Sequence, residues 1–253
     1  MLIIGVVAGG AGALLLALET SVKATDIELH PPKLPWDHKK LLGGYDHRSV
    51  RRGWEVYKNV CAACHSMRYL CYRDLVGATH TEAEAKAEAE EQMKCFKRPG
   101  KLSDHVPSPY PNEEAARAAN GGAYPPDLSY IIPARHGGED YVFHLLTGYH
   151  EPPAGVALRE GLHYNPYFVG GAIGMAQALY SEIIEYEDGT PATQSQLAKD
   201  VTNFLAWAAF PELEERKQIG IKVCSKLHII NLQSHSIRNL PAILTTRPLA
   251  TKT

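Results

Sequence analysis

A five-residue segment, Cys61-Ala62-Ala63-Cys64-His65, constrains the fold more than any other feature of this 253-residue chain. The pattern C-x-x-C-H is the one that attaches haem to protein covalently. Two thiols at this spacing can each form a thioether to one vinyl group of a porphyrin, and the histidine that follows can ligate the iron. The segment therefore predicts haem c, and with it a chain that folds around a flat, apolar cofactor.

Two other uses of a C-x-x-C pair, structural zinc binding and thiol redox chemistry, fit this sequence less well. A four-ligand zinc site needs a second pair of ligands, whereas the remaining cysteines, Cys71, Cys95 and Cys224, stand singly. A thioredoxin-like pair would follow a buried strand, but residues 50–60 have the apolar spacing of an amphipathic helix. Fortuitous clustering of the three side chains is the remaining alternative.

Methionine is a common sixth ligand in electron-transfer haem proteins, and the chain contains four. Met1 is the initiator, and Met67 lies too close to His65 to reach the opposite face of the ring. Met93 belongs to a charged stretch that we expect to be solvated. Met175 remains, among small residues that would let the backbone pass close to a ring. Core packing of Met175, and a second histidine as the sixth ligand, are alternatives that spacing leaves open.

The charge pattern gives no sign of a nucleic-acid partner and indicates one local acidic surface. The net charge is −2, so the chain is not globally basic. Residues 81–91 hold five Glu and one Lys, which we interpret as a solvated helix. Residues 182–188 hold four acids and no base, and they follow Met175 closely. This run would place negative charge near one edge of the haem and steer a basic redox partner.

The two ends of the chain are expected to differ from the part between them. Residues 1–24 carry no charge before Glu19, which favours a hydrophobic sorting signal, with a membrane anchor as the alternative. Residues 223–253 hold short apolar runs that basic residues interrupt, and none is long enough for a membrane span. We expect this tail to be basic, poorly packed chain.

Apolar spacing and capping signals predict a mainly α-helical fold with long loops, and no internal repeat or alternating strand pattern is evident. The predicted helices cover about residues 49–60, 79–94 (or from 81), 112–120, 139–147 and 195–209. Loops as long as those between them are uncommon in compact domains unless they are functional. A covalently bound haem would supply the apolar core on which such loops could wrap.

Several separate segments resemble mitochondrial cytochrome c1, the c-type haem subunit of ubiquinol–cytochrome c oxidoreductase (respiratory complex III). Besides the haem motif, they are residues 98–104, 112–120, 125–130, 134–141 and 148–153. The likeness covers about residues 26–222. It implies a mainly helical, cytochrome c-like haem domain over residues 25–222, at the mitochondrial inner membrane and facing the intermembrane space.

The resemblance implies a role in electron transport. The domain would accept an electron from the Rieske iron–sulfur protein and reduce soluble cytochrome c, beside cytochrome b and with an acidic accessory subunit as a further partner. No acid–base catalytic residue is expected, because the reaction is electron transfer and the protein sets the potential and recognises its partners.

Family roles also fall on individual positions of this chain. The implied residues are Cys61 and Cys64 as thioether sites, His65 and Met175 as axial ligands, and Arg135, Tyr141 and Pro126 as further haem contacts. Arg135 and Tyr141 would lie near the haem propionates. A guanidinium suits that place, because it pairs with a carboxylate through two parallel hydrogen bonds.

Two features depart from the family pattern. The family ends in a hydrophobic membrane helix, whereas here the likeness stops near Lys222 and residues 223–253 form a divergent tail. A soluble isoform outside the complex is therefore an alternative function, and an open-site haem enzyme such as a peroxidase is another. The family also has Pro-Pro soon after the ligand methionine, where this chain has Gln177-Ala178. That change alters the local loop and leaves the ligand assignment as it stands.

Overall fold

The computed structural model describes residues 29–93 and 98–245, and the chain divides into two compact units. The first unit comprises the chain as far as Leu34 together with His47–Ala209. The second comprises Pro35–Asp46 and the chain from Phe210 onward. Residues 1–24, expected to form a sorting signal, lie outside the described residues, as does Cys95.

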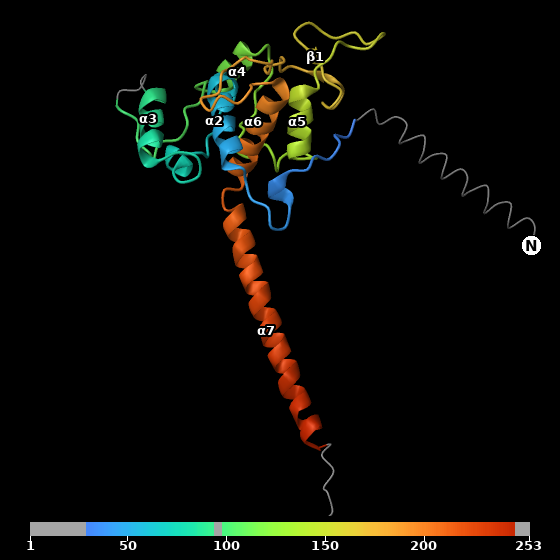
Figure 1. Cartoon of the computed structure of the whole chain (residues 1–253). Helices are drawn as coiled ribbons and strands as arrows, with labels where there is room; N and C mark the ends of the chain where they lie inside the picture. The colour runs from blue at the N-terminus through green and yellow to red at the C-terminus, as the bar shows by residue number, and fades with distance from the viewer. Residues whose placement is uncertain (1–28, 94–97, 246–253) are drawn as a thin grey trace, which may run out of the picture. The chain divides into compact units, whose positions relative to one another are not determined.

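The first unit is a set of helices joined by long loops (Figure 1). Its α-helices are α2 (His47–Asn59), α3 (Glu82–Gln92), α4 (Glu113–Ala119), α5 (Glu139–Thr147) and α6 (Gln194–Ala209), with 3-10 turns η2 (Cys61–Ala63) and η3 (Tyr72–Leu75). All five predicted helices are confirmed, as is the mainly α fold class. In the described residues the only strands are β1 (His163–Tyr164) and β2 (Ala172–Ile173), an antiparallel pair too short to leave an alternating pattern.

The core of this unit is the contact between α2 and α6, and a glycine makes it possible. A Cβ atom at Gly53 would lie 2.1 Å from the carbonyl oxygen of Asp200 and 2.5 Å from Cβ of Phe204. Only glycine lets the two backbones come this close. Trp54 and Tyr57 pack on Phe204 with ring centroids 5.7 and 5.9 Å apart, and all three side chains are fully buried. The contact therefore combines close backbone approach with an aromatic cluster.

A buried carboxylate joins the same two helices. Asp200 is fully buried, and its side chain accepts hydrogen bonds from Ser49 Oγ at 2.6 Å and from Arg52 Nε at 2.8 Å. Loss of Arg52 would leave the buried Asp200 carboxylate without its cationic partner in the interior. The pair thus disfavours any other alignment of α2 against α6.

Helix α3 packs on the domain along one face, so the prediction of a solvated helix at residues 81–91 is only partly correct. Ala85 and Ala89 are fully buried. Met93, expected to be solvated, follows the last residue of the helix and is only 8% exposed, so that expectation is wrong. The buried face was not predicted because small alanines, rather than a stripe of large apolar residues, pack the helix against the core.

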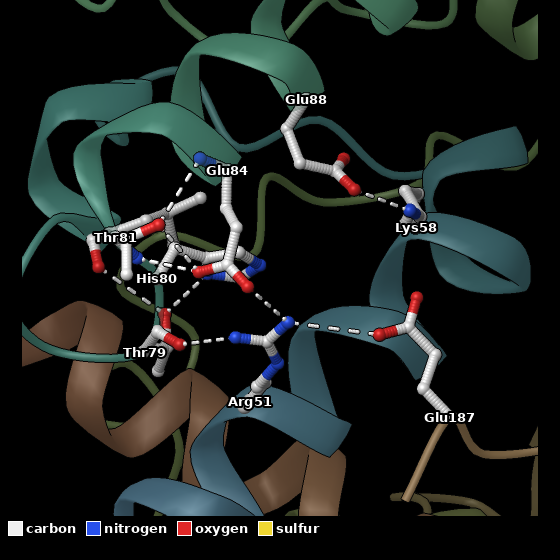
Figure 2. Close-up of polar contacts among 9 residues, drawn as sticks. Arg51, Lys58, Thr79, His80, Thr81, Glu84, Glu88 and Glu187 are labelled. Atoms are coloured by element: carbon white, nitrogen blue, oxygen red, sulfur yellow. Dashed lines mark hydrogen bonds and ion pairs between the residues drawn. The ribbon is translucent and has the colours of Figure 1, made fainter.

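Ion pairs hold the same helix to α2, as Figure 2 shows. Arg51 donates to Glu84 at 3.0 Å, and Lys58 donates to Glu88 at 2.7 Å. Glu84 also accepts a hydrogen bond from the N–H of Thr81, which completes a capping box at the helix start. The hydrogen bond from Arg51, followed by those from Thr81, lowers the pKa of Glu84 to about 2.

The second unit consists of Pro35–Asp46, which contains the 3-10 turn η1 (Asp37–Lys39), and helix α7 (Leu213–Thr245). One lysine of α7 connects the two pieces. The ammonium of Lys217 donates hydrogen bonds of 2.6, 2.6 and 2.8 Å to the carbonyls of His38, Lys40 and Gly43. Because three backbone acceptors converge on one cation, this segment is fixed to the first turns of α7.

Helix α7 includes much of the segment after residue 222, for which the sequence predicted basic, poorly packed chain. The backbone is helical as far as Thr245, while side chains such as Ile219, Leu227 and Ile230 are 51–61% exposed. Sequence reasoning missed this helix because its apolar residues are spread around the circumference and leave no stripe with a period of 3.6. Among the residues that the structure describes, no helix has both the length and the apolar content for a membrane crossing.

Replacing Glu84 with glutamine should weaken the attachment of α3 in a pH-dependent way. The folded-state pKa of about 2 lies below the ordinary value of 4.5. The carboxylate therefore contributes stability that is fully present above the ordinary value and is lost as the pH falls toward about 2. We expect the free energy of unfolding of Glu84→Gln to lie below that of the unaltered protein at pH 7, and the deficit to shrink steadily below pH 5. Denaturant titrations at a series of pH values would measure it.

Glu82→Gln is the matched control, because Glu82 is an exposed acid in the same first helical turn. This variant should show a smaller deficit at pH 7. A Glu84→Gln deficit that stays constant from pH 7 down to pH 3 would contradict the assignment to an ionised Glu84–Arg51 pair.

Candidate haem site

The C-x-x-C-H segment follows α2 directly and folds into one tight turn. Residues Cys61–Ala63 form η2, and the N–H of His65 donates to the carbonyl of Cys61 at 2.8 Å. Cys61 and Cys64 are both free thiols. Burial, with a smaller contribution from neighbouring Cys64, raises the pKa of Cys61 to about 12. A redox-active thiol has a lowered pKa instead, so these surroundings argue against a thioredoxin-like pair.

The imidazole of His65 is held in the form that binds metals. Its Nδ1 lies 2.8 Å from the carbonyl oxygen of Pro126. Because a carbonyl can only accept, Nδ1 carries the proton and Nε2 keeps a free lone pair. Burial, which outweighs the opposing effect of the Pro126 hydrogen bond, lowers the pKa of His65 and keeps the ring neutral. A neutral imidazole whose other nitrogen donates to a backbone carbonyl is a typical metal ligand.

Asp127 ties the residues after the C-x-x-C-H motif to the loop that contains Pro126. Its carboxylate accepts hydrogen bonds from the Ser66 hydroxyl at 2.8 Å and from the N–H groups of Arg68 and Ser129, both at 2.9 Å. Burial alone would raise the pKa of Asp127, but these donors outweigh it and the pKa lies below its usual value. The carboxylate is therefore ionised at neutral pH and accepts from both segments.

Tyr57 holds the same turn from the side of α2. Its hydroxyl donates to the carbonyl of His65 at 3.0 Å, while its ring belongs to the aromatic core. Burial raises the pKa of Tyr57 above its ordinary value, so the hydroxyl remains a donor. His65 is thus fixed through its backbone by the core and through its side chain by the loop.

Met175 follows β2 in the long loop between α5 and α6. Its carbonyl accepts a hydrogen bond of 3.0 Å from the hydroxyl of Tyr149. In the described part of the chain, Met67 and Met93 are buried in the core, whereas Met175 is partly exposed. Tyr149 thus anchors the backbone at the position where the sixth ligand is predicted, and the ligand role itself stays a prediction.

The remaining two predicted site residues lie on other elements. Tyr141 is half-buried on α5. Arg135 is exposed in the loop before α5, and its Nη1 donates to the carbonyl of Ala134 at 3.0 Å. Of the predicted site residues outside the motif, Pro126 is the one that a hydrogen bond between described residues joins to His65. The propionate roles of Arg135 and Tyr141 stay predictions.

The acidic run at residues 182–188 is partly neutralised by α2. Asp188 accepts a hydrogen bond from Arg52 at 2.9 Å, and a carboxylate oxygen of Glu187 lies 3.7 Å from an Arg51 nitrogen. The other two acids of the run are exposed. The run is therefore anchored to the core at one end, and its role in steering a basic partner stays a prediction.

Sequence reasoning assigned no role to Tyr57, Asp127 or Tyr149. The sequence did contain a signal for Asp127. An aspartate often forms a turn in which its side chain accepts a hydrogen bond from the N–H two residues later, as Asp127 does from Ser129. Tyr57 and Tyr149 carried none, since a tyrosine that packs in a core and one that donates to a ligand's backbone have the same sequence pattern.

The chain is similar to known proteins along most of its length. The Cytochrome C1 family matches residues 36–240, a range that extends beyond Lys222 along α7. The chain is 54% identical to cytochrome c1 2, heme protein, mitochondrial, of Arabidopsis thaliana over 253 residues, which covers 95% of this chain and 82% of that relative. It is 55% identical to the mitochondrial cytochrome b-c1 complex catalytic subunit of Candida albicans over 225 residues, covering 84% and 78%. For cytochrome c1, heme protein, mitochondrial, of Saccharomyces cerevisiae the identity is 54% over 225 residues, covering 84% and 73%. The chain belongs to the Cytochrome C1 family.

Proposed function

We propose that this chain is the haem-carrying subunit of mitochondrial complex III, and that it passes electrons from the Rieske iron–sulfur protein to soluble cytochrome c. One observation carries the proposal: the 2.8 Å hydrogen bond from His65 Nδ1 to the Pro126 carbonyl, directly after two free thiols. Family membership supports it, as do relatives named as mitochondrial heme proteins and as a subunit of the cytochrome b-c1 complex.

The donor set fits haem c. Cys61 and Cys64 supply two thiols across one short turn, and His65 supplies a neutral imidazole with Nε2 free. These three residues would hold the cofactor, with Met175 as the second axial ligand and Arg135 and Tyr141 toward the propionates. When bound, haem supplies a one-electron couple whose potential depends on the axial ligands and on burial.

The other residues of the site would work by holding these ligands in place. Tyr57 fixes the His65 backbone, and the Pro126 carbonyl fixes the tautomer and the orientation of the ring. Tyr149 fixes the Met175 backbone. No side chain has to move a proton, because electron transfer makes and breaks no bond to hydrogen. Geometry that is rigid in both oxidation states suits such a reaction.

The proposal places the haem domain at the inner membrane, facing the intermembrane space, beside cytochrome b and an acidic accessory subunit. The exposed acids of residues 182–188 would meet basic cytochrome c, with the run anchored by Arg51 and Arg52. The role of residues 1–24 as a sorting signal is part of the same proposal.

Removing both motif cysteines should separate the pigment from the polypeptide. In the unaltered protein, acidified organic solvent should leave the haem on the chain, because thioethers survive it. The double variant Cys61→Ala/Cys64→Ala should lose all covalently held haem, as measured by absorbance of the precipitated protein. Cys224→Ala is the control, because Cys224 is exposed on α7 and this variant should keep its pigment. Colour that washes out of the unaltered protein would contradict the proposal.

Replacing Met175 with leucine should open the sixth position of the iron. The far-red charge-transfer band of a sulfur ligand should disappear, and the midpoint potential should fall, because a thioether ligand raises it. The variant should also bind carbon monoxide rapidly. Met93→Leu, a change in the buried core, should keep the band. An unchanged band in Met175→Leu would contradict the ligand assignment. Rapid carbon monoxide binding by the unaltered protein would instead favour an open-site haem enzyme.

A further inference from the structure

We infer that Asp127 is a positioning residue for the axial histidine, and that its carboxylate sets both the orientation of the His65 ring and the potential of the metal that the ring would bind. The inference rests on the proposed function, because it takes His65 as an iron ligand.

Asp127 links the two segments that hold His65. The segment after the motif and the Pro126 loop lie side by side, and Asp127 joins them by accepting from Ser66 Oγ and the Arg68 N–H. Two further hydrogen bonds cross between the segments. The N–H of Leu128 donates to the Ser66 carbonyl at 2.9 Å, and the N–H of Tyr69 donates to Ser129 Oγ at 3.3 Å. The position of one segment therefore determines the position of the other.

Asp127 also orients the acceptor that holds the imidazole. The Pro126 carbonyl is part of the peptide group that enters Asp127, so the turn at Asp127 decides where this oxygen points. Asp127 fixes that turn locally, because its other carboxylate oxygen accepts from the Ser129 N–H at 2.9 Å. Proline removes one backbone freedom on the other side. The Asp127 side chain thus fixes the direction of the carbonyl oxygen that lies 2.8 Å from His65 Nδ1.

The charge of Asp127 acts on the metal site as well. Asp127 is only partly exposed, and its carboxylate accepts from three uncharged groups of the described residues, the Ser66 hydroxyl and the N–H groups of Arg68 and Ser129. These hydrogen bonds stabilise the negative charge without cancelling it. A negative charge close to an axial ligand favours the more positive, oxidised state of a metal. Asp127 would therefore hold the midpoint potential below the value that the same ligands would give without it.

The test uses the full chain with its haem attached and compares Asp127→Asn with the unaltered protein. Asparagine has the same shape but no charge, and its amide nitrogen cannot accept from the N–H groups that Asp127 satisfies. Covalent haem should be retained. The midpoint potential should rise, and the g-values of the oxidised haem in electron paramagnetic resonance, which report the orientation of the axial ligands, should shift. If Asp127 only stabilised the fold, the variant would be less stable but its midpoint potential and g-values would not change.

Asp104→Asn is the matched control. Asp104 is also a loop carboxylate that accepts a backbone N–H, from Lys101 at 2.8 Å, but its side-chain partner is Arg98 at 2.7 Å. This variant also loses one negative charge and the hydrogen bonds that a loop carboxylate accepts, but Asp104 makes none of the contacts that hold the Pro126 loop. Its g-values should match those of the unaltered protein, and its potential should shift less than that of Asp127→Asn.

Ser66→Ala covers the case in which Asp127→Asn does not fold. This variant removes one hydrogen bond to the carboxylate and keeps the charge, so it should shift the g-values while the potential changes little. The inference is overturned if Asp127→Asn folds and its potential and g-values are unchanged. If only Ser66→Ala folds, unchanged g-values in that variant overturn it. Failure of the proposed function looks different, because the unaltered protein would then carry no covalent haem before any variant is compared.

Discussion

The hydrogen bond between His65 Nδ1 and the Pro126 carbonyl is the interaction on which the site depends. It selects one tautomer, leaves Nε2 as the only free nitrogen, and joins two segments that are 61 residues apart. Burial makes a neutral ring favourable, and a neutral ring needs one donor partner and one acceptor partner. The carbonyl pairs with Nδ1–H, which leaves the Nε2 lone pair for the iron ligation proposed above.

The first unit contains much irregular chain, which polar contacts hold in place. The loops between α4 and α6 have little regular structure, and they are fixed at separate points by single polar contacts. Asn165, fully buried, donates to the Leu145 carbonyl at 2.8 Å, and Tyr149 donates to the Met175 carbonyl. The first contact joins the loop to the last turn of α5, and each contact satisfies a backbone carbonyl. A haem bound among these loops would supply the apolar surface that short helices alone do not.

The sequence predicted elements that carry local signals and missed those that depend on packing. Capping boxes and 3.6-residue spacing located α2 to α6, because residues close together in the sequence determine the ends and the buried faces of those helices. The docked face of α3 was missed because alanine marks it, and α7 was missed because its apolar residues follow no stripe. In the candidate site, Cys61, Cys64 and His65 were predicted from spacing alone. Asp127 was not, because its role comes from groups 59 and 61 residues away that only the fold brings together.

Helix α2 links the features that the function needs. Its middle packs on α6 through Gly53 and Trp54, and its end leads directly into the cysteine turn. On its outer side, Arg51 lies between an acid of α3 and an acid of the 182–188 run (Figure 2). Since one rigid helix carries all these contacts, the core that holds the His65 backbone also anchors the charged surface proposed to meet a partner. The distance from that surface to the haem would then be set by the helix rather than by flexible loops, and electron transfer depends on such a fixed distance.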